Sequence, residues 1–356
     1  MTGDRRGRLS HEPDACPARV AIGGVTVDPP LVLGPMAGST NRTLRLLCRR
    51  GGAGLVCSEM VSVNAIMQGS ERTHRMLETW PREHPVSIQL FGAEPEIMRD
   101  AVPVAVAAGA DIIDINMGCC VPKVRRGGAG VALMADPKHA EALTAAAVEA
   151  SAVPVTVKIR AGLTADDGGY VEFARRMQGA GAAAVTVHWR TAAQGFRGTP
   201  GWERIARVVE ALEVPVIGSG DVRQPEDALR MIGESGCAAV MIARGAWGRP
   251  WLFGQAAAAL RGEGAGAEGS LAERFGVALL HAQMLALDDG ERLAVHQMRQ
   301  QMHHYMKGLP NAALFRRQID KSRIGREVGG VPREQHPRIA VGLALRHQVE
   351  QRHARP

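Results

Sequence analysis

Short apolar runs rich in valine and isoleucine alternate along most of this chain with longer segments whose hydrophobic positions recur at helical spacing. This alternation predicts β-strands separated by α-helices, and nearly continuous apolar strands are typical of a parallel sheet that is covered on both faces. The predicted strands are residues 31–36, 54–60, 85–91, 111–117, 153–160, 183–188, 214–218 and 238–243.

The number of predicted strands indicates the fold class. Eight βα units favour a closed (β/α)8 barrel, the TIM-barrel fold. The alternative is an open, doubly wound sheet, but no G-x-G-x-x-G turn follows the first predicted strand. We therefore predict an α/β protein built on a TIM barrel.

A stretch rich in glycine, alanine and glutamate, residues 261–270, interrupts this pattern. After it the periodicity is helical and lacks β-branched runs, which predicts a small helical bundle; residues 294–307, for example, are followed by the helix-stopping Gly308 and Pro310. The expected organisation is an N-terminal segment (1–28), a barrel domain (29–260), a helical domain (271–328) and a C-terminal tail (329–356).

The amino-acid composition restricts the class of protein to which the chain can belong. The chain is 46% hydrophobic and 22% charged, as in ordinary soluble proteins, and residues 1–18 lack the apolar run of a secretory signal or a membrane span. We expect a cytoplasmic monomer with no membrane association. Six cysteines form no C-x-x-C pair, so neither a metal site nor a disulfide framework is indicated. The formal net charge of +7 suggests an anionic partner, although many proteins are mildly basic without one.

Polar and unusual residues recur where the predicted strands end. In a (β/α)8 barrel these ends converge on one rim, where active sites lie. The residues are Pro35, Met36, Ala37, Gln89, Asn116, Cys119, Lys158, Arg160 and His188. Their joint placement predicts a site, although Gln89 or His188 alone is more often a satisfied polar group.

Two glycine-containing turns end the last two predicted strands. They contain Ser219, Gly220 and Asp221 in one turn and Ala243 and Arg244 in the other. Backbone N–H groups at such turns, together with an arginine, complement a phosphomonoester, and this position is the recurrent phosphate site of the fold. Glycines that merely close tight turns are the alternative.

Lys158 would be costly at an interior strand end unless an anion or an electron-rich ring lies beside it. It fits the N1/O2 edge of a flavin, where its charge would stabilise the anionic reduced ring. Gln89 and His188 could hydrogen-bond the polar edges of the same ring.

The strings PMAG, SEMVS, IQLFG, DINMGC, VKIR, GSGD and ARGAWGRPW, with the histidine of VHWRT, resemble the tRNA-dihydrouridine synthase family, particularly its bacterial B-type. The resemblance covers about residues 30–320. It implies a barrel that carries FMN, a C-terminal helical tRNA-binding domain, NADPH as the reductant and tRNA as the substrate.

The resemblance also implies roles for individual residues. Cys119 takes the place of the catalytic cysteine and Asn116 lies beside the substrate base. Hydride passes from flavin N5 to uracil C6, and a thiol that is largely protonated at neutral pH can protonate C5. The flavin ring would be surrounded by Pro35, Met36, Ala37, Gln89, Lys158 and His188, and its phosphate held by Ser219, Gly220, Asp221, Ala243 and Arg244.

A base inside folded RNA must be extruded to reach a barrel, so basic residues that grip the RNA backbone are expected. For each cation alone a solvated or ion-paired role is the better interpretation, but as a set they favour RNA. The candidates for substrate binding, besides Asn116, are Lys123, Arg160, Arg197, Arg316 and Arg317.

The sequence departs from the family pattern at four positions. Cys120 stands where a proline usually follows the catalytic cysteine; it could oxidise with a partner, replace Cys119 as the donor or pack inward, but the spacing from Asn116 favours Cys119. Trp189 and Ala243 replace glycines, and Ser219 replaces an asparagine.

Two rival functions remain: a barrel flavoenzyme that reduces a free pyrimidine or an enone, and a catalytically silent RNA-binding relative.

Overall fold

The computed structural model describes residues 18–165, 167–266, 268–309 and 312–313. Arg316, Arg317 and the predicted tail lie outside the described residues. The contacts divide the chain between Glu268 and Gly269 into two compact units, which are described separately.

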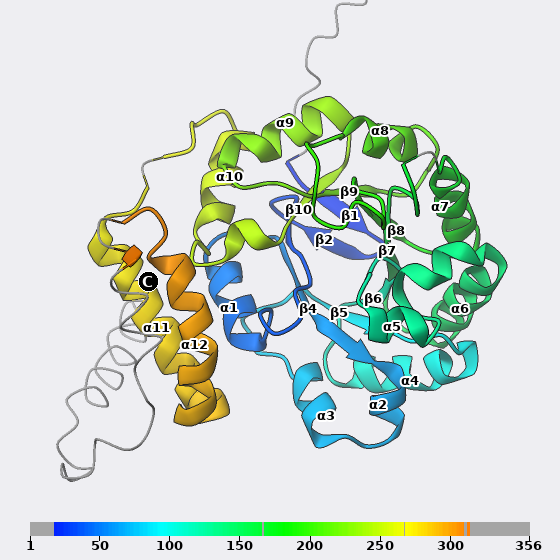
Figure 1. Cartoon of the computed structure of the whole chain (residues 1–356), viewed down its shortest axis with the longest axis horizontal. Coiled ribbons are helices and arrows are strands. Elements are labelled where there is room, and N and C mark those ends of the chain that lie inside the picture. The colour runs from blue at the N-terminus through cyan, green and yellow to red at the C-terminus, as the bar shows by residue number, and fades with distance from the viewer. Residues whose placement is uncertain (1–17, 166, 267, 310–311, 314–356) are drawn as a thin grey trace, which may run out of the picture. The chain divides into compact units, whose positions relative to one another are not determined.

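The first unit is a closed barrel of eight parallel strands surrounded by helices (Figure 1). Each predicted strand is present, and the predicted (β/α)8 fold is confirmed. Around the barrel the strand order is β10-β3-β4-β5-β6-β7-β8-β9. The bounds are β3 Leu31–Leu33, β4 Leu55–Ser62, β5 Val86–Phe91, β6 Ile112–Asn116, β7 Val155–Arg160, β8 Ala184–His188, β9 Val216–Ser219 and β10 Ala239–Ile242.

The strands form where the sequence is richest in β-branched residues, and nearly all of their residues are buried between the barrel interior and the helices. The surrounding helices are α1 Arg42–Arg50, α2 Val63–Met67, α3 Glu71–Leu77, α4 Pro95–Ala107, α5 Pro122–Arg126, α6 Pro137–Ala150, α7 Tyr170–Gly179, α8 Glu203–Val209, α9 Pro225–Ser235 and α10 Leu252–Leu260. Short 3-10 helices span Gly130–Ala135 and Arg244–Ala246.

The helix boundaries follow local sequence signals. α4, α6 and α9 each begin with a proline, whose fixed φ and missing N–H suit the first helical position. Side-chain caps begin several helices: for example, Asn41 accepts a hydrogen bond from the Leu44 N–H in α1, and Asp136 accepts one from the His139 N–H in α6. These starts set where each strand-to-helix loop ends, and those loops form the rim of the barrel.

An antiparallel hairpin precedes the barrel, within the segment for which no element was predicted. Its strands are β1 Val20–Ile22 and β2 Val25–Val27, joined by Gly23 and Gly24. The apolar side chains of the hairpin pack in one cluster with barrel residues that include Leu55 and Ile112. These lie at the starts of their strands, so the hairpin covers the end of the barrel opposite the candidate site.

The second unit contains helices α11 Leu271–Asp289 and α12 Glu291–Tyr305, which pack against each other. A reciprocal capping box of Ser270 and Glu273 begins α11. The C-terminal helices predicted to follow the barrel are therefore present. Among the described residues, none of the helices combines the length and hydrophobicity needed to cross a membrane.

Candidate active site

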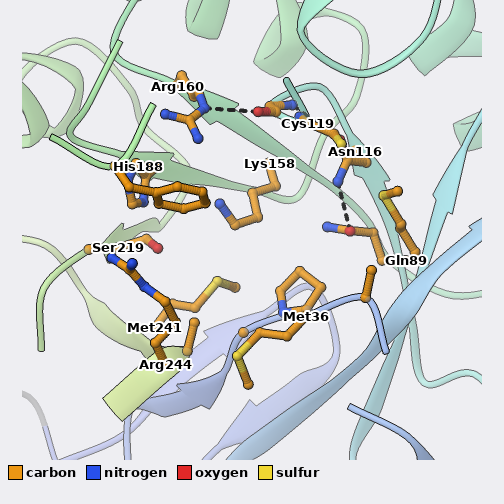
Figure 2. A pocket seen from close by; sticks show the side chains of 18 of the residues that line it. Met36, Gln89, Asn116, Cys119, Lys158, Arg160, His188, Ser219, Met241 and Arg244 are labelled. Atoms are coloured by element: carbon orange, nitrogen blue, oxygen red, sulfur yellow. Dashed lines mark hydrogen bonds between the residues drawn. The ribbon is translucent and has the colours of Figure 1, made fainter. Parts of the chain in front are cut away.

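A cavity of about 350 Å³ opens at the C-terminal ends of the barrel strands. Every residue predicted to surround the flavin ring or its phosphate lines this cavity, and so do Asn116, Cys119 and Arg160 (Figure 2). The same rim therefore brings together residues as far apart in the sequence as Pro35 and Arg244. Parallel strands in a closed barrel produce this convergence.

Buried amide and carboxylate groups form a chain of hydrogen bonds below the cavity. Gln89 donates from Nε2 to Asp114 Oδ2 over 2.7 Å, and Asn116 donates from Nδ2 to Gln89 Oε1 over 2.8 Å. Asn116 Oδ1 in turn accepts the Cys119 backbone N–H over 2.9 Å. The loop that carries the thiol is thereby tied to β5 and β6.

Cys119 is half-buried, and burial raises the pKa of its thiol above the ordinary value. The backbone hydrogen bond at Val121 and the cations Arg160 and Lys158 lower that pKa by smaller amounts, and the neighbouring Cys120 raises it slightly. A thiol with a raised pKa stays protonated at neutral pH, so it can act as an acid. The Cys120 thiol instead contacts the backbone oxygens of Gly118 and Ala192 and packs against the core.

The cavity is cationic. Burial and the nearby Arg160 lower the pKa of Lys158 to about 8, so its ammonium group is still mostly protonated at pH 7. Burial, reinforced by Lys158 and three arginines, lowers the pKa of His188 to about 2, so its ring is neutral. The buried His188 Nε2 has no hydrogen-bond partner within the described protein. A buried polar atom beside several cations suits a ligand that carries both hydrogen-bonding atoms and negative charge.

The turn after β9 is stabilised by its own side chains. Asp221 has a left-handed backbone, with φ of 60°, and its carboxylate lies 2.6 Å from Arg190 Nη2. Trp189 Nε1 donates to the same carboxylate over 3.2 Å, and Arg244 lies 3.7 Å from it. The side chain of Asp221 is thus bound by cations, and all three residues of the turn line the cavity.

Trp189 occupies the space beside Gly220. The indole is 2% exposed, and a Cβ placed on Gly220 would lie 2.5 Å from its Cδ1 atom. Arg190 covers the other part of the ring, 4.2 Å from the ring centroid. The tryptophan therefore fills a position where the family pattern has glycine, and it packs directly on the turn.

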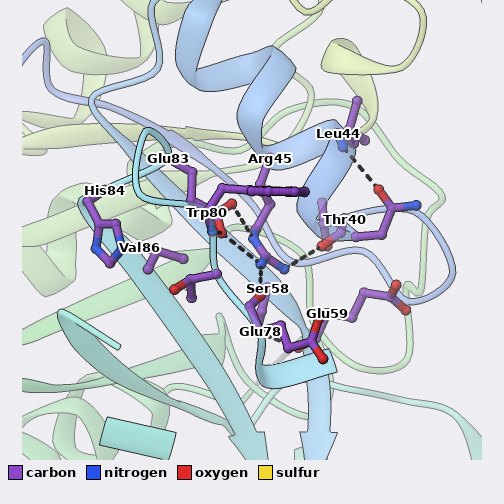
Figure 3. Close-up of polar contacts among 12 residues, drawn as sticks. Thr40, Leu44, Arg45, Ser58, Glu59, Glu78, Trp80, Glu83, His84 and Val86 are labelled. Atoms are coloured by element: carbon purple, nitrogen blue, oxygen red, sulfur yellow. Dashed lines mark hydrogen bonds and ion pairs between the residues drawn. The ribbon is translucent and has the colours of Figure 1, made fainter. Parts of the chain in front are cut away.

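A buried ion pair supports the segment that contains Pro35, Met36 and Ala37 (Figure 3). Arg45 of α1 donates from Nε and Nη2 to the two carboxylate oxygens of Glu83, at 2.8 and 3.0 Å. Its Nη1 also donates to the Thr40 carbonyl, and Thr40 Oγ1 accepts the Met36 N–H over 2.9 Å. α1 and the loop before β5 thus hold the first rim segment, a role that the sequence analysis did not assign to either residue.

The structure does not bring all the predicted substrate residues to the cavity. Lys123, on α5, and Arg197, after β8, are exposed and do not line it. Arg160 lines it, but its guanidinium donates to the carbonyls of Gly118, Thr191 and Gly195 and so ties two rim loops together. Lining residues that the sequence analysis missed are Met60, Val121, Phe196, Val222, Arg223, Met241 and Trp247, together with Gly34, Gly118 and Gly245.

Two of these missed lining residues stand at positions in the sequence that could have indicated the site. Met60 is the last residue of a predicted strand, and Arg223 follows the predicted phosphate turn. Phe196 lies on the long loop after β8, beside the predicted Arg197, and its ring lies 4.7 Å from the Arg244 guanidinium carbon. No periodic pattern marks a loop residue, which is why it was missed.

These features define a class of protein: a (β/α)8 barrel enzyme with a half-buried thiol, a buried ammonium group and a cationic turn at one rim. Within the described residues, no group of three or more His, Cys, Asp or Glu side chains could hold a metal ion.

Comparison with known proteins identifies the family. Residues 32–334 match the family model "Dihydrouridine synthase (Dus)". The chain is 38% identical over 301 residues to "tRNA-dihydrouridine synthase B" of Xanthomonas campestris pv. campestris, covering 85% of this chain and 91% of that protein. It is 38% identical over 314 residues to "Probable tRNA-dihydrouridine synthase 1" of Synechocystis, covering 87% and 88%. The chain belongs to the dihydrouridine synthase family.

Solved structures resemble the barrel more distantly. Histamine dehydrogenase from Rhizobium sp. 4-9 matches with a TM-score of 0.53 at 13% identity, over 70% of this chain and 48% of that one. At this identity the likeness supports the fold alone.

Proposed function

We propose that this enzyme reduces uridine to 5,6-dihydrouridine in tRNA, with FMN as the bound cofactor, NADPH as the reductant and Cys119 as the acid. The observation that carries the proposal is the half-buried Cys119, whose backbone N–H donates to Asn116 Oδ1 and which lines a cationic cavity, in a chain that belongs to the dihydrouridine synthase family.

The residues that line the cavity fit FMN. Lys158 supplies a buried positive charge, His188 a polar atom without a protein partner, and Gln89 an amide. The turns at 219–221 and 243–244, with Arg244, suit a phosphate group. When bound, FMN supplies the hydride for uracil C6.

The protein itself supplies the proton. Because burial raises its pKa, the Cys119 thiol carries a proton at neutral pH and can transfer it to C5 of the uracil. Asn116, which fixes the Cys119 backbone, also lines the cavity and can contact the edge of the base. The overall reaction consumes one uridine, one NADPH and one proton and yields dihydrouridine and NADP⁺.

The names of the relatives support tRNA as the substrate. The exposed Lys123, in the first turn of α5, and the exposed Arg197, after β8, lie within two residues of the cavity-lining Val121 and Phe196, so they can contact the RNA backbone around an extruded base. We propose that the second unit, and Arg316 and Arg317, also bind tRNA. We also propose that residues 29–260 form the catalytic domain and residues 271–328 the tRNA-binding domain.

The test compares Cys119→Ala with Cys120→Ala in the FMN-loaded protein, with NADPH and unmodified tRNA. We expect Cys119→Ala to lower dihydrouridine formation by at least about 100-fold, because general acid catalysis contributes about that much. Cys120→Ala should stay within about threefold of wild type, because its thiol packs against the core.

Reduction of the flavin by NADPH alone serves as the control, since it needs no proton donor for uracil and should be equal in both variants. Full activity in Cys119→Ala would show that the acid is another group. A loss confined to Cys120→Ala would move that role to the neighbouring thiol.

A further inference from the structure

Asp114 lies at the centre of the hydrogen-bond chain that ends at Cys119, although it borders only a small void deeper in the barrel. It is 2% exposed, and both carboxylate oxygens are occupied: Oδ1 accepts from Thr156 Oγ1 over 2.6 Å and Oδ2 from Gln89 Nε2 over 2.7 Å. Neither the fold nor the proposed chemistry requires a carboxylate at this depth.

The barrel register places these groups side by side. Gln89 on β5 pairs with Asp114 on β6, and Asp114 pairs with Thr156 on β7. Asn116 is two residues further along β6 and therefore points into the barrel on the same face as Asp114. Gln89 bridges the two positions, because its Nε2 donates to Asp114 and its Oε1 accepts from Asn116.

The carboxylate fixes the direction of every amide in the chain. An ionised carboxylate only accepts hydrogen bonds, so Gln89 must point its NH2 group toward Asp114 and its oxygen toward Asn116. Asn116 must then donate to Gln89, which leaves its Oδ1 to accept the N–H groups of Gly118 and Cys119. The reverse orientation of either amide would place two donors against each other.

The charge state of Asp114 agrees with this role. Burial raises its pKa to about 6, against the opposing effects of the hydrogen bonds from Thr156 and Gln89 and of the Lys158 charge. The group is therefore ionised at pH 8.

We infer that Asp114 is a positioning residue, which sets the orientation of Gln89 and Asn116 and thereby holds the Cys119 backbone in place. The inference rests on the proposed role of Cys119 for its functional meaning. The structural claim needs neither cofactor nor RNA, so it can fail or succeed independently of the proposed function.

The test is amide hydrogen exchange at pH 8 in the full-length protein as purified, followed in a peptide that contains Gly118 and Cys119. Asp114→Leu has a similar shape but no acceptor, and it should speed exchange there by on the order of tenfold, the value of one net hydrogen bond. Asp114→Asn should restore protection to within about threefold, because its oxygen can accept from Gln89 while its amide donates to Thr156 Oγ1.

Ser87→Ala is the matched control, since it removes a buried hydroxyl from the same face of β5, outside the chain of hydrogen bonds. It should leave exchange at Cys119 unchanged. If Asp114→Leu does not fold, Thr156→Val, which removes one donor to the carboxylate, should raise exchange at the same peptide by a smaller factor.

Three results would overturn the inference. Unchanged exchange at Cys119 in the variants that fold would mean that other contacts, such as the hydrogen bond from Arg160 to Gly118, hold the loop. Equal acceleration in α6 would indicate general destabilisation. An Asp114→Asn protein as altered as Asp114→Leu would show that the charge of Asp114, and not its hydrogen bonds, matters.

Discussion

Gly220 has a φ of 121° and lies against the ring of Trp189, so a side chain at this position would be both strained and blocked. Gly220→Ala should therefore displace the turn after β9 and weaken FMN binding by about tenfold or more, since a strained backbone position costs on the order of 1–3 kcal/mol. The measurement is the dissociation constant for FMN from flavin fluorescence.

Gly233→Ala is the matched control. Gly233 lies within α9, and a Cβ there would meet no heavy atom within 4 Å. This variant should bind FMN as wild type does and be more stable by up to about 1 kcal/mol, because alanine is the better helix former. Equal FMN affinity in the two variants would contradict the role given to the turn.

Individual site residues were predictable where a polar side chain ends a strand. Lys158 and His188 stood out because a barrel strand otherwise consists of apolar residues. Their partners were not predictable, because pairings such as Arg190 with Asp221 or Asn116 with Gln89 depend on which strands become neighbours. For the same reason the hydrogen bonds from the Arg160 guanidinium to three backbone carbonyls were not predictable.

At the scale of elements, α1 is fixed to the loop before β5 by the Arg45–Glu83 pair, whose side chains are 2% and 0% exposed. Glu83→Gln would leave the Arg45 charge buried without its counter-ion, which typically costs about 3–5 kcal/mol. We expect a drop of that size in the free energy of unfolding of the barrel unit, measured by urea denaturation.

The comparison variant is Glu149→Gln, which breaks the exposed pair of Glu149 with Arg99. Solvent and salt screen that pair, so its loss should cost less than about 1 kcal/mol. A similar, small loss in both variants would mean that the buried pair does not anchor α1.

The eight barrel strands were predictable because each is a short β-branched run between helical segments. The β1–β2 hairpin was missed although its signal was present: two glycines join alternating valine-rich runs, as in a tight hairpin turn. The short helices α2, α3 and α5 were not foreseen individually, because five to seven residues are too few to show helical periodicity.

At the scale of the whole molecule, a barrel with a half-buried thiol at its rim is followed in the chain by a helical unit, and the formal net charge is +7. A reductase of free pyrimidines would need the cavity but neither the helical unit nor the positive charge. Substrate preference therefore separates the proposed function from that rival.

The most direct test is reduction by the full-length protein, loaded with FMN and supplied with NADPH, of unmodified tRNA and of free uridine at equal uridine concentration. Digestion and mass spectrometry would detect dihydrouridine by the mass of the two added hydrogen atoms. We predict dihydrouridine in the tRNA and little or none from free uridine. Equal reduction of free uridine, or no dihydrouridine in tRNA despite bound and reducible flavin, would contradict the proposed function.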